Sequence, residues 1–223
     1  MKVFVFGITG GVGGLLATEL LRRGDDVAGL VRREDQRSAL RSRGIAARVG
    51  DLATMSASAI ADAIRGSDVL VFSAGSNGGS TATTEAIDRR ALATVTDAAG
   101  SAGVRRLASV SVLPESWRER DLDEELESYF TVKKDADVAL SRSALDWLIL
   151  RPSMLVDAAP TGTVSLGPAE LHGEIARADV AVTLAELLHE PGIRRQILEL
   201  NGGAVPIAEA VAANVRGGPA SGR

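Results

Sequence analysis

The chain is 223 residues long, 45% hydrophobic and 24% charged, which is enough for one sizeable core and fits a single domain. A net charge of −4 and a pI of about 5.3 supply no basic surface for nucleic acid. No stretch reaches the ~18 uninterrupted apolar residues of a membrane span. With no cysteine and two histidines, disulfides and a zinc site lack their residues, so we expect no metal site and a reducing, cytoplasmic location.

Short β-branched runs alternate with helical patterns, which predicts a parallel sheet wrapped by crossover helices. We expect strands at 2–6, 27–31, 45–49, 68–72, 106–111 and 146–150. We expect the helices between them at 13–23, 35–43, 56–65, 82–102 and 123–142. The strands are continuous hydrophobic runs such as "VFVF" and "WLIL", which is typical of a sheet covered on both faces.

The pattern loosens after residue 151. A segment broken by proline and glycine runs to about residue 172. A helix at 178–189, a strand at 196–200 and a helix at 206–215 are expected to follow.

These elements predict an α/β fold, a Rossmann-type doubly wound parallel sheet flanked by helices, with a small C-terminal cap. We expect one domain over 1–215, a substrate cap within 152–205 and a disordered tail at 216–223. So small a cap predicts a shallow ligand pocket, or one completed by a partner subunit. The sequence is compatible with a monomer and with a homodimer.

A glycine-rich loop, "GITGGVG", lies between the first expected strand and the first expected helix. Gly7, Gly10 and Gly13 allow a tight turn and let backbone N–H groups approach a pyrophosphate at the positive end of the helix. The alternative is a plain turn, since the chain has 24 glycines. The strand before the loop and the amphipathic helix after it favour a dinucleotide phosphate site.

The residue that closes the second strand of a dinucleotide fold distinguishes the two cofactors: an acid binds a ribose hydroxyl, whereas an arginine accommodates the 2′-phosphate of NADP. Here "GLVRRE" supplies Arg32 and Arg33, whose guanidinium groups can make paired bonds to phosphate. We therefore predict NADP rather than NAD. The alternative is a solvated arginine at the end of a strand.

Two later loops are candidates for contact with the same cofactor. "VGDL" places Asp51 and Leu52 where they could border the adenine, although Asp51 could equally cap a turn. The small residues in "SAGS", namely Ala74, Gly75 and Ser76, would leave room over the middle of a bound nucleotide.

A tyrosine and a lysine share one helical face in "SYFTVKK". Tyr129 and Lys133 are four residues apart, so both can point at one substrate. A nearby ammonium favours the phenolate and should lower the tyrosine pKa. The alternative is an apolar stripe in which Tyr129 packs with Val132, Ala136 and Ala139. Only three of the 25 basic residues are lysines, which favours a chemical role for Lys133.

The chain resembles an atypical short-chain dehydrogenase/reductase. The segments that carry the resemblance are "GITGGVGG", "LVRR", "VGDL", "SAGS", "YFTVK", "LDWLILRPSMLVD" and "RADVAVTLAELL". The subgroup resembled is that of the small NAD(P)H-binding proteins similar to NmrA-like proteins and biliverdin reductase B-type flavin reductases. The resemblance runs from residue 1 to about 215. It implies that the pyrophosphate is held by Gly7, Thr9, Gly10, Val12 and Gly13.

The resemblance also implies roles for the other candidate residues. Arg32 would hold the 2′-phosphate, and the nicotinamide would be lined by the backbone of Pro152, Ser153 and Met154. Tyr129 would be the acid/base. Lys133 would be its activator and ribose anchor.

One departure concerns the serine or threonine that polarises the substrate oxygen in this superfamily. "LASVSVLPES" offers Ser111, whereas the residue that aligns with the usual serine is Val112. Neighbouring residues of a strand point to opposite faces, so only one of them can reach the site. If Val112 does, one donor is missing, which can cost about 100-fold in turnover.

Three functions fit these residues. The first is an NADPH-dependent oxidoreductase acting on a small carbonyl, imine, flavin or quinone, with Tyr129, Lys133 and Ser111 as catalytic residues. The second is a redox-neutral epimerase, isomerase or dehydratase on the same scaffold. The third is a regulatory protein that senses NADP(H).

Overall fold

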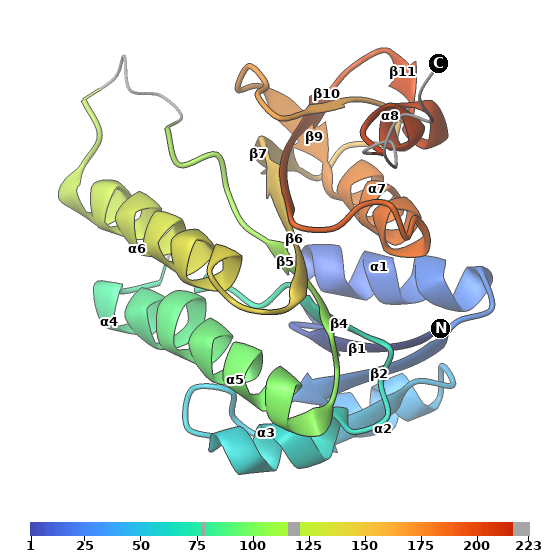
Figure 1. Ribbon diagram of the computed structural model, residues 1–223, viewed down its shortest axis with the longest axis vertical. Helices are drawn as coiled ribbons and strands as arrows, with labels where there is room; N and C mark the ends of the chain where they lie inside the picture. The colour runs from blue at the N-terminus through green and yellow to red at the C-terminus, as the bar shows by residue number, and fades with distance from the viewer. Residues whose placement is uncertain (77–78, 116–120, 216–223) are drawn as a thin grey trace, which may run out of the picture.

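The computed structural model describes residues 1–76, 79–115 and 121–215 (Figure 1). In this part of the chain a nine-stranded sheet has the order β11-β8-β10-β6-β5-β4-β1-β2-β3. The parallel strands are β1 (Lys2–Phe6), β2 (Asp26–Val31), β3 (Ala46–Val49), β4 (Val69–Phe72), β5 (Arg106–Val110), β6 (Asp146–Pro152) and β10 (Gln196–Gly202). β8 (Thr163–Gly167) runs antiparallel to β10 and to β11 (Val205–Pro206).

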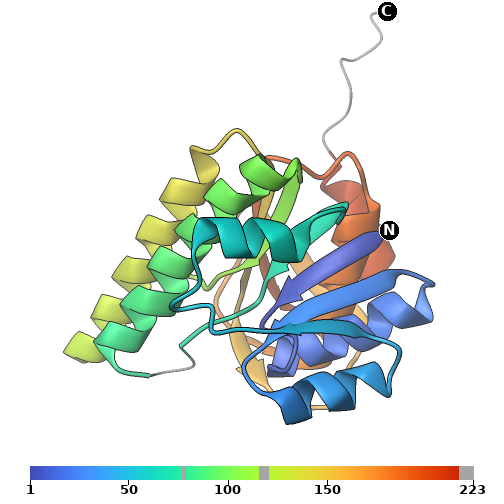
Figure 2. The same ribbon diagram turned by 90° about the horizontal axis from the view of Figure 1, so that it is seen from below.

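Helices cover both faces of the sheet (Figure 1 and Figure 2). One layer holds α1 (Gly11–Arg22), α2 (Glu34–Arg41), α7 (Arg177–His189) and α8 (Ile207–Ala213). The other holds α3 (Ala57–Ile64), α4 (Thr81–Thr84), the π-helical segment η1 (Glu85–Ala91), α5 (Leu92–Ala102) and α6 (Glu124–Ser141). Strand β1 shows why two layers are needed: Val3 and Val5 pack into one core and Phe4 and Phe6 into the other.

The strand order reverses at β1, which lies between β2 and β4. The connections that follow β1 and β4 cross to opposite faces of the sheet. The loops at the carboxyl ends of these two strands therefore diverge, and between them lies the crevice where doubly wound folds bind ligands. The expected Rossmann-type fold is confirmed. The crevice contains the glycine loop and the loop after β4.

Two elements show detail that was not expected. The helix expected at 82–102 is present as α4, η1 and α5 in succession, and its middle part, η1, is π-helical, which the hydrophobic pattern does not distinguish from an α-helix. The segment before residue 172 contains β8, and it also contains β7 (Met154–Val156), which pairs with β9 (Glu174–Ala176) in a small parallel sheet. The prolines and glycines around these short strands interrupt the alternation of apolar and polar residues by which a strand is predicted.

Two further findings concern the limits of the chain. The tail expected at 216–223 lies outside the described residues. No helix within the described ranges combines the length and the apolar character that crossing a membrane requires.

Candidate nucleotide-binding and catalytic site

The glycine loop leads into helix α1, whose N-terminus has no side-chain cap. Gly7 has a φ of 82°, which favours glycine, and its carbonyl accepts a hydrogen bond of 2.9 Å from the Gly10 amide. Helix α1 begins at Gly11 without a side-chain cap and without an acidic residue in its first turn. Its free N–H groups and positive dipole end therefore suit an anion.

Close backbone packing requires the glycines at both ends of the loop. A Cβ atom on Gly7 would lie 2.5 Å from the Ser73 carbonyl oxygen, and one on Gly13 would lie 2.2 Å from the Gly7 carbonyl oxygen. Thr9 and Gly10 are exposed, whereas Val12 is buried, so Val12 could contact a phosphate only through its backbone. The loop fits the pyrophosphate of a dinucleotide.

The two arginines after β2 differ in their surroundings. The Arg33 guanidinium forms an ion pair with Asp35 at 3.1 Å. Arg32 is exposed, and among the described residues its guanidinium has no hydrogen-bond or ion-pair partner. Arg32 can therefore meet a 2′-phosphate without giving up a partner.

The predictions for Asp51 and Leu52 fit the structure only in part. Asp51 Oδ1 accepts a hydrogen bond of 3.0 Å from the Ala53 amide, as in the turn-capping alternative. Leu52 is 9% exposed and packs in the core with Phe6 and Leu30. Only the Leu52 backbone could border an adenine.

The loop after β4 is held by a buried acid that the sequence analysis did not single out. Asp88, in η1, is 1% exposed, and its Oδ2 accepts a hydrogen bond of 3.0 Å from the Ser76 amide. Thr84 donates a further bond of 2.9 Å to the Ser76 hydroxyl. Ala74 and Gly75 precede Ser76 in this loop, so Asp88 fixes the small residues expected over the cofactor.

Asp88 also binds the candidate lysine. Lys133 is buried, and its ammonium donates to Asp88 Oδ1 at 3.1 Å and to the Val110 carbonyl oxygen at 3.3 Å. A buried ammonium needs such partners, because an unpaired charge in the interior is costly. The sequence did contain a signal for Asp88: Ala91 and Leu92, three and four residues later, are apolar, so the acid falls on an apolar helical stripe.

The pKa of Tyr129 was expected to be lowered, and this expectation was wrong. Burial raises the pKa of the Tyr129 hydroxyl above its ordinary value of 10.0; the Lys133 charge lowers it and the Asp88 charge raises it. Within the described part of the chain the hydroxyl forms no hydrogen bond that would favour the phenolate. Tyr129 is therefore a protonated phenol at neutral pH, suited to donating a proton.

The Ser111 hydroxyl lies near the Asp137 carboxyl. Ser111 is 4% exposed, and its hydroxyl is close enough to the Asp137 carboxyl to lower the Asp137 pKa, although it completes no hydrogen bond. Asp137 follows Tyr129 by eight residues on α6, which is about 12 Å along a helix axis. The structure thus brings Ser111 to Asp137 and leaves Val112 half-buried one residue further on.

Asp137 is the second buried acid that the sequence analysis did not single out. Its Oδ2 accepts a hydrogen bond of 2.9 Å from the Arg151 guanidinium, which also lies 3.8 Å from Glu199 Oε1. Burial raises the Asp137 pKa, while Arg151 and Ser111 lower it. Tyr129, Lys133 and Asp137 follow one another at intervals of four residues, which was the available signal for a polar face on α6.

The residues expected along the nicotinamide connect β6 to the cap. Pro152 and Ser153 are buried, and the Ser153 hydroxyl accepts a hydrogen bond of 3.3 Å from the Gly173 amide. The Met154 amide donates to the Gly173 carbonyl oxygen at 3.1 Å, while its side chain is 39% exposed. Met154 therefore presents an apolar side chain at the carboxyl edge of the sheet.

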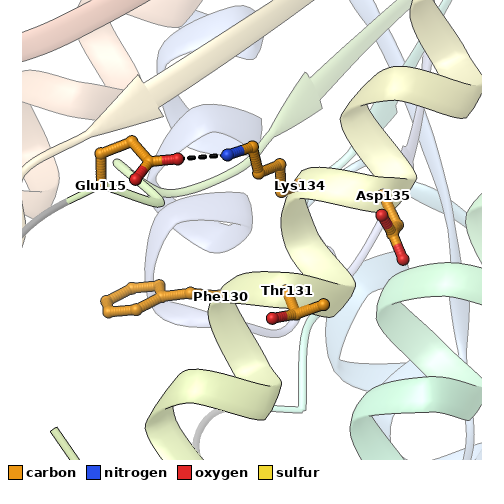
Figure 3. Close-up of a pocket in the computed structure, with 5 residues that line it drawn as sticks. All are labelled: Glu115, Phe130, Thr131, Lys134 and Asp135. Atoms are coloured by element: carbon orange, nitrogen blue, oxygen red, sulfur yellow. Dashed lines mark hydrogen bonds and ion pairs between the residues drawn. The ribbon is translucent and has the colours of Figure 1, made fainter.

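Figure 3 shows a hollow of about 470 Å³ on another side of α6, with Lys134 directed at Glu115. Its lining residues are Glu115, Phe130, Thr131, Lys134 and Asp135. Phe130 and Lys134 each follow a candidate catalytic residue by one position, which turns them about 100° around the helix. The hollow is thus separate from the face that carries Tyr129 and Lys133. The described residues contain no cluster of His, Asp and Glu side chains that could hold a metal ion.

Known proteins match the chain over most of its length. The model of the NAD(P)H-binding family matches residues 7–191. YhfK of Bacillus subtilis, named an uncharacterized sugar epimerase, is 36% identical over 214 residues, which are 95% of this chain and 99% of that protein.

Two solved structures are also similar. A protein from Bacillus halodurans described as a putative NAD-dependent epimerase/dehydratase superposes with a TM-score of 0.87 at 31% identity, over 96% of this chain and 99% of its own. ChuY, an anaerobillin reductase from Escherichia coli O157:H7, has a TM-score of 0.77 at 30% identity and covers 92% of this chain and 98% of its own. With the glycine loop, the strand order and these matches in agreement, the chain belongs to the NAD(P)H-binding family and to the atypical short-chain dehydrogenases/reductases.

Proposed function

We propose that this protein is an NADPH-dependent reductase of a small carbonyl, imine, flavin or quinone. The observation that carries the proposal is the half-buried Tyr129, a phenol next to the Lys133–Asp88 pair on the edge where the cofactor loops meet. A reduction needs a proton donor at this place. The reductase ChuY, at 30% identity over most of both chains, supports the same direction of chemistry.

The residues would divide the work as follows. NADPH, when bound, supplies a hydride to the substrate. The Tyr129 hydroxyl donates its proton to the substrate atom that gains electron density, and Lys133 stabilises the phenolate that remains. Asp88 fixes the position of the ammonium.

The glycine loop and Arg32 would hold the cofactor. Backbone N–H groups at Gly10 to Gly13 would meet the pyrophosphate. The Arg32 guanidinium, which has no side-chain partner among the described residues, would meet the 2′-phosphate, which favours NADPH over NADH. Ala74, Gly75 and Ser76 would lie over the middle of the cofactor, and the backbone of Pro152, Ser153 and Met154 would line its nicotinamide end.

The test is a panel of flavins, quinones, carbonyls and imines, with NADPH consumption followed by nicotinamide absorbance. We expect turnover with at least one class, faster with NADPH than with NADH. Replacing the only tyrosine, Tyr129→Phe, should lower kcat about 100-fold or more while NADPH binding is kept. Tight NADPH binding without turnover of any class would instead favour an NADP(H) sensor.

A redox-neutral epimerase or dehydratase is the second candidate. It is favoured by the epimerase name of YhfK and by the Ser111 hydroxyl, which lies near the Asp137 carboxyl. Product formation with no net change in nicotinamide absorbance would establish this function. The reductase proposal would then be wrong.

A further inference from the structure

Arginine 177 lies across the first turn of α1. It is the first residue of α7, and α7 packs against α1 in the same layer (Figure 1). A Cβ atom on Gly11 would lie 2.8 Å from Arg177 Cδ and 3.1 Å from its Nε. The side chain of Arg177 therefore occupies the space that a side chain on residue 11 would fill, directly at the helix end that suits an anion.

The Arg177 guanidinium is paired with a carboxylate that is exposed to solvent. It pairs with Asp157 at 2.8 Å, but the Asp157 side chain is 88% exposed and can turn into water. The acid in the first turn of α7, Asp179, is buried and accepts hydrogen bonds from the amides of Thr161 and Gly162 at 2.9 and 3.0 Å. No acid lies in the first turn of α1.

We propose that Arg177 is a cofactor-binding residue that exchanges Asp157 for the pyrophosphate of NAD(P)H. The proposal rests on the dinucleotide site of the proposed function. A guanidinium donates paired, charge-assisted hydrogen bonds to phosphate oxygens and adds a full charge to the partial charge of the helix end. Gly11 has a second role here, because it leaves the space through which Arg177 reaches α1.

This assignment separates two arginines by the part of the cofactor that each recognises. Both NADPH and NADH carry the pyrophosphate, whereas only NADPH carries the 2′-phosphate. Arg177 therefore sets the affinity for both nucleotides. Arg32 sets the difference between them.

The experiment measures NADPH and NADH affinity by nicotinamide fluorescence, at several salt concentrations, for the whole chain. We expect Arg177→Met to weaken both nucleotides about 10-fold and to reduce the salt dependence of binding, and Arg177→Lys to recover part of the loss. Arg32→Gln should weaken NADPH alone. Asp157→Asn should tighten both nucleotides a few-fold, because it removes the competing carboxylate.

Two further variants guard against a purely structural effect. Arg65→Gln breaks an exposed ion pair, Arg65–Asp62 at 2.9 Å, on α3 and should leave binding unchanged. Gly11→Val keeps the arginine but displaces its side chain, and should weaken both nucleotides. Thermal unfolding without nucleotide shows whether each variant is folded.

The outcomes separate the two proposals. If the unmodified protein binds neither nucleotide, the proposed function fails. If it binds them and folded Arg177→Met binds equally well, Arg177 only packs against Gly11 and the inference fails alone. A loss confined to NADPH would also overturn the inference, because it would assign Arg177 to the 2′-phosphate.

Discussion

The Asp88 carboxylate joins Lys133 to the cofactor loop. One oxygen accepts from the Lys133 ammonium at 3.1 Å and the other from the Ser76 amide at 3.0 Å. A single buried side chain of the π-helical segment thus sets the position of the candidate activator on α6 and of the loop after β4. A change at Asp88 should affect both.

Replacing Asp88 by asparagine should lower the pKa of Tyr129. Burial and the Asp88 charge both raise that pKa, and without the Asp88 charge only burial opposes the Lys133 charge. Because the chain has one tyrosine, tyrosinate ultraviolet absorbance during an alkaline titration reports this group alone. An unchanged or higher pKa in folded Asp88→Asn would contradict the electrostatic assignment. The control is Asp135→Asn, an exposed change on α6, the helix that carries Tyr129.

The pH profile of reduction should fall only in the alkaline range. Tyr129 donates a proton, so kcat/KM stays level through neutral pH and decreases as pH rises past its raised pKa, above 10.0. In Asp88→Asn the falling limb should begin at lower pH. A rate that instead increases from neutral to alkaline pH would identify Tyr129 as a base.

Arg32 and Arg33 should differ in their effect on cofactor choice. Arg32 has no side-chain partner in the described ranges, whereas Arg33 is paired with Asp35. We expect Arg32→Gln to lower NADPH affinity about 10-fold with NADH affinity unchanged, and Arg33→Gln to have a smaller effect. Equal losses in the two variants, measured by nucleotide titration, would argue for a shared site.

Gly13 and Gly14 are neighbours that should respond oppositely to alanine. A Cβ on Gly13 would lie 2.2 Å from the Gly7 carbonyl oxygen, so Gly13→Ala should distort the loop, weaken nucleotide binding and lower the unfolding temperature. The nearest atom to a Cβ on Gly14 is the Ile8 carbonyl oxygen at 3.5 Å, an ordinary contact. Gly14→Ala should therefore stabilise α1 by about 0.5–1 kcal/mol in a denaturant titration.

Removing the partner of Asp137 should destabilise the fold in a pH-dependent way. Arg151→Met leaves a carboxylate that is 3% exposed without its cation, which should cost about 3 kcal/mol at neutral pH. Burial already raises the Asp137 pKa, and losing Arg151 raises it further. The deficit should therefore be small below pH 3.8, where the carboxyl is protonated, and should grow as pH rises through the folded-state pKa.

Two controls accompany that denaturation experiment. Asp137→Asn combined with Arg151→Met removes the buried charge and should recover part of the lost stability. Arg65→Met, which breaks an exposed pair, should change the free energy of unfolding by less than about 1 kcal/mol. A deficit that does not depend on pH would mean that Arg151 acts through packing alone.

The fold could be predicted from the sequence because its main strands are continuous apolar runs separated by helical periodicity. Phe4 and Phe6, against Val3 and Val5, already require two covered faces. The short strands of the cap could not be predicted, because β8 is specified by its pairing with β10 rather than by its own pattern. The π-helical turn is equally hidden, since the apolar stripe continues on both sides of it.

The candidate site was only partly predictable for a related reason. The glycine loop and the Tyr129–Lys133 spacing are local patterns that the sequence alone displays. The pKa of Tyr129 depends on burial and on Asp88, which lies 45 residues before Lys133. The surroundings of Ser111 depend on Asp137 and Arg151, so no local pattern could assign its hydroxyl.

The cap shares its backbone hydrogen bonds with the nucleotide-binding part of the sheet. Strand β10 pairs with β6 on one side and with β8 on the other. Separating the cap as a rigid body would break the ladder between β6 and β10, so no hinge divides the two parts. Substrate entry should therefore proceed without domain closure, and heat or denaturant should unfold cap and body in one cooperative transition.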